Sequence, residues 1–314
     1  MAEAMHDRAE ELTALRRGAQ AEVAKLVLGH EEAVELTLMA ALAGGHVLLE
    51  GPPGTAKTLL AAAMARVLGV PFKRVQFTPD TTPNEITGRM IWTGRERRFE
   101  RGIVFTNVLL ADEINRTPPR TQAALLEAMQ EGHVTVDGET HWLARPFVVI
   151  ATQNPYEHEG IFPLPESQLD RFFVKIVLEY GSEEDEVKML SIPHRGISTD
   201  MLGDVVPLVA EGRFLVLQSI VDATVVPESV ARFLIAVVRR TRQASGVTLG
   251  ASPRSAIHLL AAAKANARLS GRDHVVADDI VAMAPHVLRH RIILDGTDSD
   301  TVVRDAVRVV RSAS

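Results

Sequence analysis

Five short apolar runs, separated by stretches of helical periodicity, limit most strongly what this chain can fold into. They lie at 46–50, 72–77, 107–113, 147–152 and 171–178. Nearly continuous apolar strands with amphipathic helices between them are typical of a parallel sheet that helices cover on both faces. The sequence therefore predicts an α/β fold on a mainly parallel sheet, an architecture that often binds nucleotides.

Beyond Glu179, β-branched runs become rare and helical periodicity dominates. In 227–243 and 252–271, apolar residues recur at three- and four-residue spacing. The second stretch has a complete set of end signals, with Ser252 as N-cap, Pro253 at the first helical position and Gly271 past the end. We expect an α/β core at 1–195, followed by a connecting segment and a smaller helical domain at 196–314.

Two segments of the predicted core have the pattern of β-hairpins. In HVTVDGETHW, at 133–142, Asp137 and Gly138 lie between alternating residues and favour a two-residue turn. In RMIWTGRERRFERGIVF, at 89–105, Gly94 offers a turn between strands whose alternation is poorer. Both are expected as insertions in the core.

Composition excludes several classes of protein. With 314 residues, 46% apolar and 24% charged, the chain can bury substantial cores and divide into two domains. Its formal net charge of −6 argues against general affinity for nucleic acid, because nonspecific binding to phosphate depends on excess lysine and arginine. The absence of cysteine excludes disulfides, thiolate metal sites and thiol nucleophiles.

No stretch has the length and apolarity of a membrane helix. The longest apolar tract, 33–49, is interrupted by Glu35, two glycines and His46, and it falls short of the ~20 apolar residues that a span needs. The N-terminus mixes both charge signs and lacks the apolar core of a secretory signal. We expect a soluble, cytoplasmic protein.

The segment GPPGTAKT, at 51–58, lies between an apolar run and a helical stretch. A tight loop there aims several backbone N–H groups at a phosphate, and the helix dipole adds positive potential. Lys57 would reach the β- and γ-phosphates, and the Thr58 hydroxyl would bind Mg²⁺. The alternative is an ordinary turn with a surface lysine. The expected nucleotide-binding residues are Gly51, Pro52, Pro53, Gly54, Thr55, Ala56, Lys57, Thr58 and Leu59.

Ala56 stands where the strict phosphate-loop pattern has a glycine. Its methyl group is tolerated if the residue has helical φ and ψ. The unusual turn is then expected at Gly51 and Gly54.

Two adjacent carboxylates, Asp112 and Glu113, end the apolar run at 107–113. They are predicted at the carboxyl edge of the sheet, where ligands of such folds bind. Asp112 can hold the Mg²⁺ shell, and Glu113 can polarise a water for in-line attack on a γ-phosphate. An acidic pair facing solvent becomes improbable when a phosphate loop precedes it by about 55 residues in a parallel-sheet pattern.

Two further polar residues are placed to serve the same site. Asn154 follows the run at 147–152 and could hydrogen-bond the attacking water or the γ-phosphate; alternatively it forms a turn before Pro155. Arg254 lies in the first turn of its predicted helix, where a cation opposes the helix dipole. A nearby phosphate would resolve that conflict, although a solvent-screened arginine is equally compatible with the sequence.

With these residues together, the chain resembles the AAA+ ATPases and, within them, the MoxR family. The motifs, in order, are GPPGTAKT, VLLADEINRTPPRTQAALLEAMQEG, ATQNP, LPESQLDRF and GASPRSAIHLLAAA. The resemblance covers nearly the whole chain except the first two dozen and last twenty residues. It implies a P-loop AAA+ core with a parallel five-stranded sheet flanked by helices, followed by an all-α lid, and an alanine before the lysine is common in this family.

The resemblance also implies roles for individual residues. LPESQLDRF looks like the segment that places an arginine finger, here Arg171, against the nucleotide of a neighbouring subunit; the local alternative is that Arg171 pairs with Asp170 or ends a short helix. A finger delivered in trans requires an oligomer, in this family a hexameric ring. The segment LVLGHEEAV is similar to the family's segment beside the adenine. The resemblance implies that Val27, Leu28 and Gly29 contact the adenine.

The two hairpins match the helix-2 and pre-sensor insertions of the clade that includes magnesium chelatase. Such insertions reposition the lid in these relatives, so the resemblance leaves the position of Arg254 open. Arg116, after the acidic pair, is favoured for a subunit contact.

The expected function is ATP hydrolysis with Mg²⁺ that drives remodelling or maturation of a protein client, as the resemblance implies, with a partner carrying a von Willebrand factor A domain. A nucleic-acid remodeller is the rival, because five arginines accompany Trp92 and Phe99 around the first hairpin. A non-hydrolysing nucleotide-dependent scaffold is another, and the joint presence of Glu113, Asn154 and Arg171 argues against it.

Overall fold

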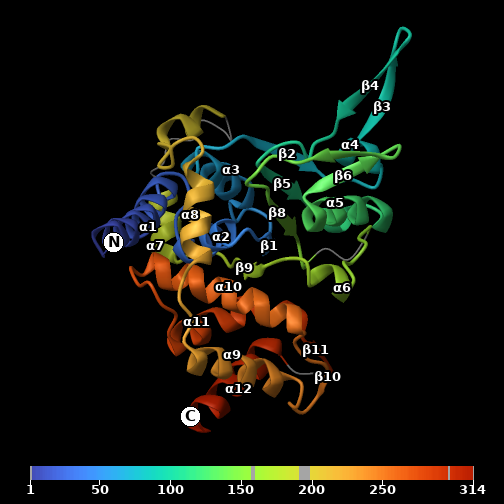
Figure 1. Cartoon of the computed structure of the whole chain (residues 1–314). Coiled ribbons are helices and arrows are strands. Elements are labelled where there is room, and N and C mark those ends of the chain that lie inside the picture. Colours follow the sequence, from blue (N-terminus) through green and yellow to red (C-terminus); the bar gives the residue numbers. More distant parts are fainter. Residues whose placement is uncertain (1, 157–159, 191–198, 296–297, 314) are drawn as a thin grey trace.

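The computed structural model describes residues 2–156, 160–190, 199–295 and 298–313. A five-stranded sheet forms its centre, and every neighbouring pair of strands is parallel (Figure 1). The strands, in order across the sheet, are β2 (Phe72–Gln76), β5 (Val108–Asp112), β8 (Val148–Gln153), β1 (Val47–Glu50) and β9 (Val174–Val177). The predicted parallel sheet is therefore confirmed.

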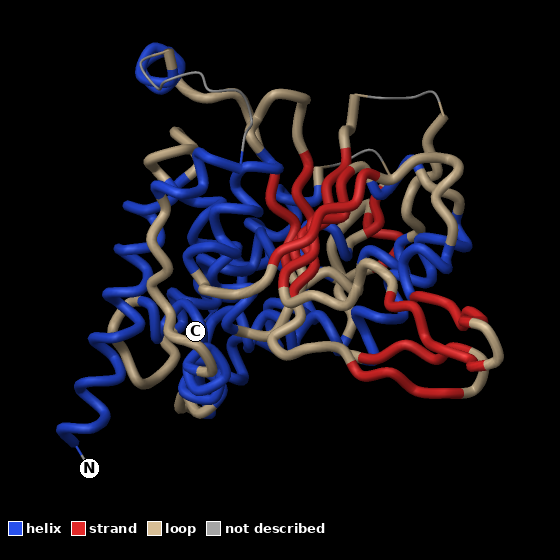
Figure 2. Tube along the Cα trace, turned by 90° about the horizontal axis from the view of Figure 1, so that it is seen from above, coloured by secondary structure: helices blue, strands red, loops and turns tan. Residues whose placement is uncertain are grey.

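Alternation along the strands divides the core in two. Val47 and Leu49 of β1 belong to one cluster of buried apolar side chains, and Leu48 between them belongs to another. The first cluster is completed by helices α1 (Ala2–Val23), α2 (Glu31–Leu42) and α3 (Lys57–Val67). The second is completed by α4 (Pro83–Thr87) and α5 (Pro119–Glu131). Helices thus cover both faces of the sheet, which Figure 2 shows from above.

Both predicted hairpins form, and they pack on each other. The first pairs β3 (Gly88–Thr93) with β4 (Glu96–Arg101), and the second pairs β6 (His133–Val136) with β7 (Glu139–Trp142). The rings of Phe99 and His141 stack between them, with centroids 3.7 Å apart. An ion pair joins Arg97 to Asp137. The hairpins project from the end of the sheet opposite the N-terminus (Figures 1 and 2).

The remaining chain is mainly helical. Its elements are α6 (Glu166–Leu169), α7 (Glu183–Met189), α8 (Arg213–Asp222), α9 (Glu228–Thr241), α10 (Pro253–Leu269), α11 (Ala277–Leu288) and α12 (Ser299–Ala313), with a short antiparallel pair of β10 (Val247–Leu249) and β11 (Ile293–Leu294). The predicted cap of α10 is present, because the Ser252 Oγ accepts a hydrogen bond from the Ser255 N–H at 3.1 Å. The predicted boundary between residues 195 and 196 lies outside the described residues.

The helices α9 to α12 are docked on the core rather than separate from it. Side chains of α9, α10 and α11 belong to the same buried cluster as α1, α2 and α3, and α10 contacts both α1 and α2 (Figure 1). Among the described helices, none is long and apolar enough to cross a membrane.

Candidate nucleotide site

The phosphate loop follows β1 and ends where α3 begins at Lys57. A Cβ at Gly51 would lie 2.6 Å from the Leu178 carbonyl oxygen, so only glycine fits against β9 there. Gly54 has φ +85°, and no other group would lie within 4 Å of an added Cβ. The loop is therefore tight at its base and open at its tip, where phosphate would bind.

Lys57 lies across this loop. Its Nζ donates to the carbonyl oxygens of Gly51 at 2.8 Å and Pro52 at 2.6 Å. These carbonyl contacts hold the ammonium group beside the open tip of the loop, and Lys57 and Gly54 line one cavity. Lys57 is the first residue of α3.

The expectation for Ala56 is wrong. Its φ is +55° and its ψ is +23°, in the left-handed region, where we expected right-handed helical angles if the alanine was to be tolerated. The turn into α3 reverses at this residue, so its geometry is the one that favours the glycine of the strict pattern. A residue with a Cβ loses roughly 1–2 kcal/mol in that region.

Asp112 is held on both of its carboxylate oxygens. Its Oδ1 accepts from the Thr152 hydroxyl at 2.6 Å. Its Oδ2 accepts from the Thr58 hydroxyl at 3.4 Å and from the Arg74 Nη2 at 2.7 Å. The two groups predicted to bind Mg²⁺, Thr58 and Asp112, are thus direct neighbours.

Glu113 leaves the sheet in a left-handed conformation, with φ +56° and ψ +51°. Its N–H donates to the Thr152 hydroxyl at 2.9 Å, and its Oε2 accepts from the Gln76 Nε2 at 2.6 Å. Arg116 Nε lies 2.9 Å from the same carboxylate oxygen. Such backbone strain in a non-glycine residue persists only where the surroundings over-determine it, and it is common at active sites.

Asn154 follows β8 and lines the same cavity as the phosphate loop. Its Oδ1 also accepts a hydrogen bond from the Tyr156 N–H at 3.1 Å. The turn expected from Asn before proline and a position at the nucleotide site are therefore compatible.

These groups surround one cavity of about 360 Å³, a size typical of ligand sites. Its lining residues come from the phosphate loop, the first turn of α3 and the carboxyl ends of β5 and β8. They are Pro53, Gly54, Thr55, Ala56, Lys57, Thr58, Leu59, Asp112, Glu113, Thr152, Gln153 and Asn154. The donors fit ATP and Mg²⁺, because a hydroxyl and a carboxylate supply the hard oxygen ligands that Mg²⁺ prefers, beside a loop that can receive phosphate.

The predicted arginines lie elsewhere. Arg171 and Arg254 both line a second cavity, of about 330 Å³, which shares no lining residue with the first. Arg171 was expected within a strand, but β9 begins only at Val174. Neither guanidinium lines the nucleotide cavity of its own chain.

Asp170 does not pair with Arg171. Its Oδ1 accepts from Arg291 Nε at 2.8 Å, and its Oδ2 lies 3.7 Å from Arg254 Nη1. No side-chain hydrogen bond or ion pair joins Arg171 to any residue that the structure describes. Burial and then the charge of Arg291 lower the pKa of the neighbouring His258 to about 3, so this histidine is neutral and the arginines supply the positive charge.

Val27, Leu28 and Gly29 connect α1 to α2 and do not line the nucleotide cavity. Val27 is buried, and a Cβ at Gly29 would lie 2.9 Å from the Asp185 carboxylate of α7.

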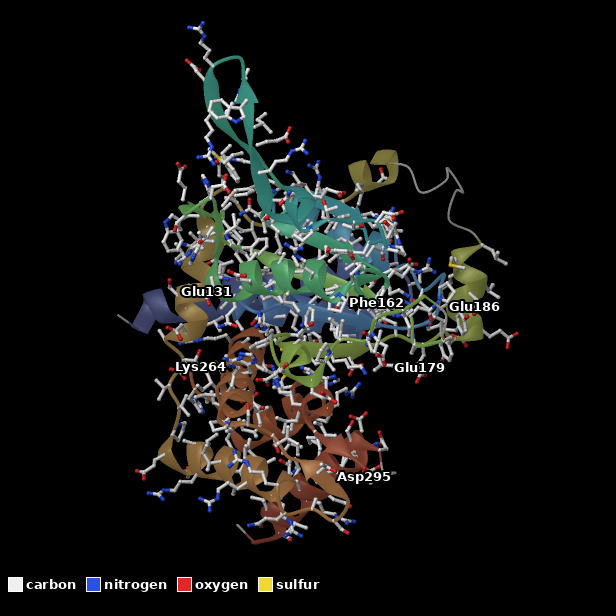
Figure 3. All side chains as sticks on the ribbon, turned by 90° about the vertical axis from the view of Figure 1, so that its right-hand side faces the viewer. Glu131, Phe162, Glu179, Glu186, Lys264 and Asp295 are labelled. Atoms are coloured by element: carbon white, nitrogen blue, oxygen red, sulfur yellow. The ribbon has the colours of Figure 1, made fainter. Side chains whose placement is uncertain are left out.

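Figure 3 shows Glu186 of α7 at one edge of the molecule and Glu131 at the other. Glu131 is the last residue of α5 and follows Gln130, which lines the second cavity together with Arg171 and Arg254.

Sequence reasoning missed three residues of the site, Arg74, Gln76 and Thr152. Arg74 and Gln76 alternate along β2, and Thr152 lies near the end of β8. Polar side chains near the carboxyl end of an otherwise apolar run were a usable signal.

This fold and cavity define a P-loop nucleotide-binding protein of the AAA+ type. Residues 46–174 match the ATPase family associated with various cellular activities, and residues 239–308 match the AAA lid domain.

Comparison with individual proteins identifies the family within the AAA+ class. It is 43% identical to the chaperone MoxR1 of Mycobacterium tuberculosis, over 87% of this chain and 74% of that protein. It is also 43% identical to the uncharacterized protein YeaC of Bacillus subtilis, over 96% of each chain. A solved structure of a candidate ATPase from Cytophaga hutchinsonii is 36% identical and superposes with a TM-score of 0.89, over 98% of this chain and 97% of that one. The chain belongs to the MoxR family of AAA+ ATPases.

Proposed function

We propose that this protein hydrolyses ATP with Mg²⁺ at sites shared between copies of the chain, and that hydrolysis drives remodelling or maturation of a protein client. The observation that carries this proposal is the division of the site, with carboxylates and phosphate loop at one cavity and two arginines at another. A γ-phosphate in the first cavity then needs the arginines of a second copy.

Within one copy, Lys57 binds the β- and γ-phosphates, and the residues from Gly51 to Leu59 other than the two prolines donate their backbone N–H groups. Thr58 and Asp112 would hold Mg²⁺, which would neutralise charge on the phosphates. Glu113 accepts the proton of the attacking water, and Asn154 orients that water or the γ-phosphate. By resemblance to the family, the adenine would extend beyond the phosphate cavity to Val27, Leu28 and Gly29, which do not line that cavity.

The neighbouring copy contributes Arg171 and Arg254. Both guanidinium groups would stabilise the charge of the transition state, a role in which an arginine finger is worth roughly 10³–10⁵ in rate. A heterologous contact of this kind generates a ring when its rotation closes, and a hexamer is proposed by analogy with the family.

The rest of the proposal follows the family. The client is a protein complex, and a partner with a von Willebrand factor A domain assists. Hydrolysis drives movements of the two hairpins, which are insertions in the core at 1–195, and of the helical lid, which with its connecting segment occupies 196–314. The protein works in the cytoplasm, without nucleic acid and without membrane insertion.

The test replaces Glu113 with Gln, which removes the base and keeps the shape. We expect phosphate release to fall at least about 10²-fold and the variant, with ATP, to retain a protein client in a pull-down. Glu127→Gln, at an exposed position of α5, is the matched control and should keep full turnover. Negligible turnover in the unsubstituted protein would identify a scaffold instead, and recovery of DNA or RNA would identify a nucleic-acid remodeller.

A further inference from the structure

Arg74 makes the shortest contact with the Asp112 oxygen that faces Thr58. It lies on β2, directly across from Leu110 of β5, and its side chain is 47% exposed, whereas that of Asp112 is 10% exposed. Two of its nitrogens donate to Asp112 Oδ2, Nη2 at 2.7 Å and Nε at 3.1 Å. A half-exposed cation therefore neutralises a carboxylate that is almost buried.

The choice of oxygen matters. Oδ1 of Asp112 accepts a hydrogen bond from the Thr152 hydroxyl. Oδ2 is therefore the oxygen that a cation between Asp112 and Thr58 would bind. A guanidinium and a divalent ion cannot both make close contacts with that oxygen without strong repulsion between them. The two cations must compete.

We propose that Arg74 is the counter-cation of Asp112 before the metal arrives, and that it sets the Mg²⁺ affinity of the site by competing for Oδ2. This inference rests on the proposed function. Arg74 acts through Asp112 and is therefore a positioning residue rather than a catalytic one.

The same arginine is linked to Glu113. Its Nη2 donates to Gln76 Oε1 at 3.0 Å, and Gln76 Nε2 donates to Glu113 Oε2 at 2.6 Å. When Mg²⁺ displaces Arg74, Gln76 loses a hydrogen bond that orients its amide. Metal binding at Asp112 is thereby coupled to the hydrogen bond that Gln76 donates to Glu113.

The experiment measures how Mg²⁺ promotes binding of a fluorescent ADP, in the unsubstituted protein and in Arg74→Gln. ADP is chosen because it lacks the γ-phosphate, so a lost contact between Arg74 and that group cannot hide the effect. We expect the Mg²⁺ concentration at half-effect to fall about three- to tenfold in Arg74→Gln, the range expected for loss of a half-exposed charged pair. Arg74→Lys keeps the charge with a less suitable geometry, and its value should lie between the two.

The control is Arg89→Gln, which removes an arginine with an ion pair of the same length, 2.7 Å to Glu100, on the first hairpin. It should leave the Mg²⁺ dependence unchanged. An unchanged or raised Mg²⁺ requirement in Arg74→Gln, with ADP still bound, would overturn the inference alone. Failure of the unsubstituted protein to bind ADP at any Mg²⁺ concentration would overturn the proposed function itself.

Discussion

Two residues of the nucleotide site, Ala56 and Glu113, have left-handed backbone angles that a Cβ disfavours. Glu113 directly follows β5, and Ala56 lies where the phosphate loop turns into α3. For Glu113 the surrounding hydrogen bonds explain how the conformation is held. Ala56 has no such compensation from a side chain, because its methyl group cannot form a hydrogen bond.

Replacing Ala56 with Gly should therefore raise the free energy of unfolding, by about 1 kcal/mol, because the strain of the left-handed alanine exceeds the extra chain entropy of glycine. Denaturant unfolding without nucleotide measures the change. The matched control is Ala62→Gly, in the right-handed interior of α3, which should lower stability by about 1 kcal/mol. A loss of stability in both variants would contradict the strain assigned to Ala56.

At the scale of elements, His46 joins three parts of the core. It precedes β1, its Nδ1 accepts from the Val149 N–H of β8 at 3.0 Å, and its Nε2–H donates to the Met129 carbonyl oxygen of α5 at 3.0 Å. This pattern requires the neutral ring. Burial lowers the pKa of His46 to about 4.

Acid should consequently destabilise the fold. An unfolded histidine binds a proton near pH 6.5, so the contribution of His46 is complete above that pH and is lost progressively as the pH falls toward 4. Between pH 6.5 and 5 the loss from this residue is about 2 kcal/mol. His46→Gln, whose amide can accept and donate, should show a smaller decrease in unfolding free energy over this range. The exposed His274→Gln should behave like the unsubstituted protein, and equal slopes for all three would exclude His46 as the cause.

At the scale of the whole molecule, the proposed function divides one active site between the nucleotide cavity of one copy and the cavity lined by Arg171 and Arg254 of the next. If so, activity should depend on pairs of copies. Glu113→Gln and Arg171→Ala proteins should each be inactive alone and regain turnover when mixed. Random mixing joins an intact carboxylate to an intact arginine at about a quarter of the interfaces. Phosphate release before and after exchange of subunits measures this recovery.

Glu113→Gln mixed with Lys57→Ala is the control for complementation. Both changes affect the same cavity, so no interface of that mixture has an intact phosphate loop and carboxylate together, and no recovery is expected. Equal recovery in both mixtures, or none in either, would rule out a site shared between copies.

Local pattern was sufficient for the sheet, both hairpins and the cluster of Lys57, Thr58, Asp112 and Glu113. Strand periodicity reports burial on two faces, and parallel strands bring their carboxyl ends to one edge whatever their order. These predictions depend on residues that are close in sequence, and the structure has the predicted sheet, hairpins and cluster. The ends of elements were less certain, as Arg171 shows, because capping and strand pairing decide them.

Contacts between distant residues were decided only by the tertiary structure. Arg74 reaches Asp112 because β2 lies beside β5, and Arg171 shares a cavity with Arg254 because α10 docks beside the end of α6. Spacing along the chain contains no measure of such proximity, since strand order and helix docking depend on the packing of all side chains together. The sequence by itself determined which chemical groups the protein has for nucleotide chemistry; the packed fold decided which of them meet.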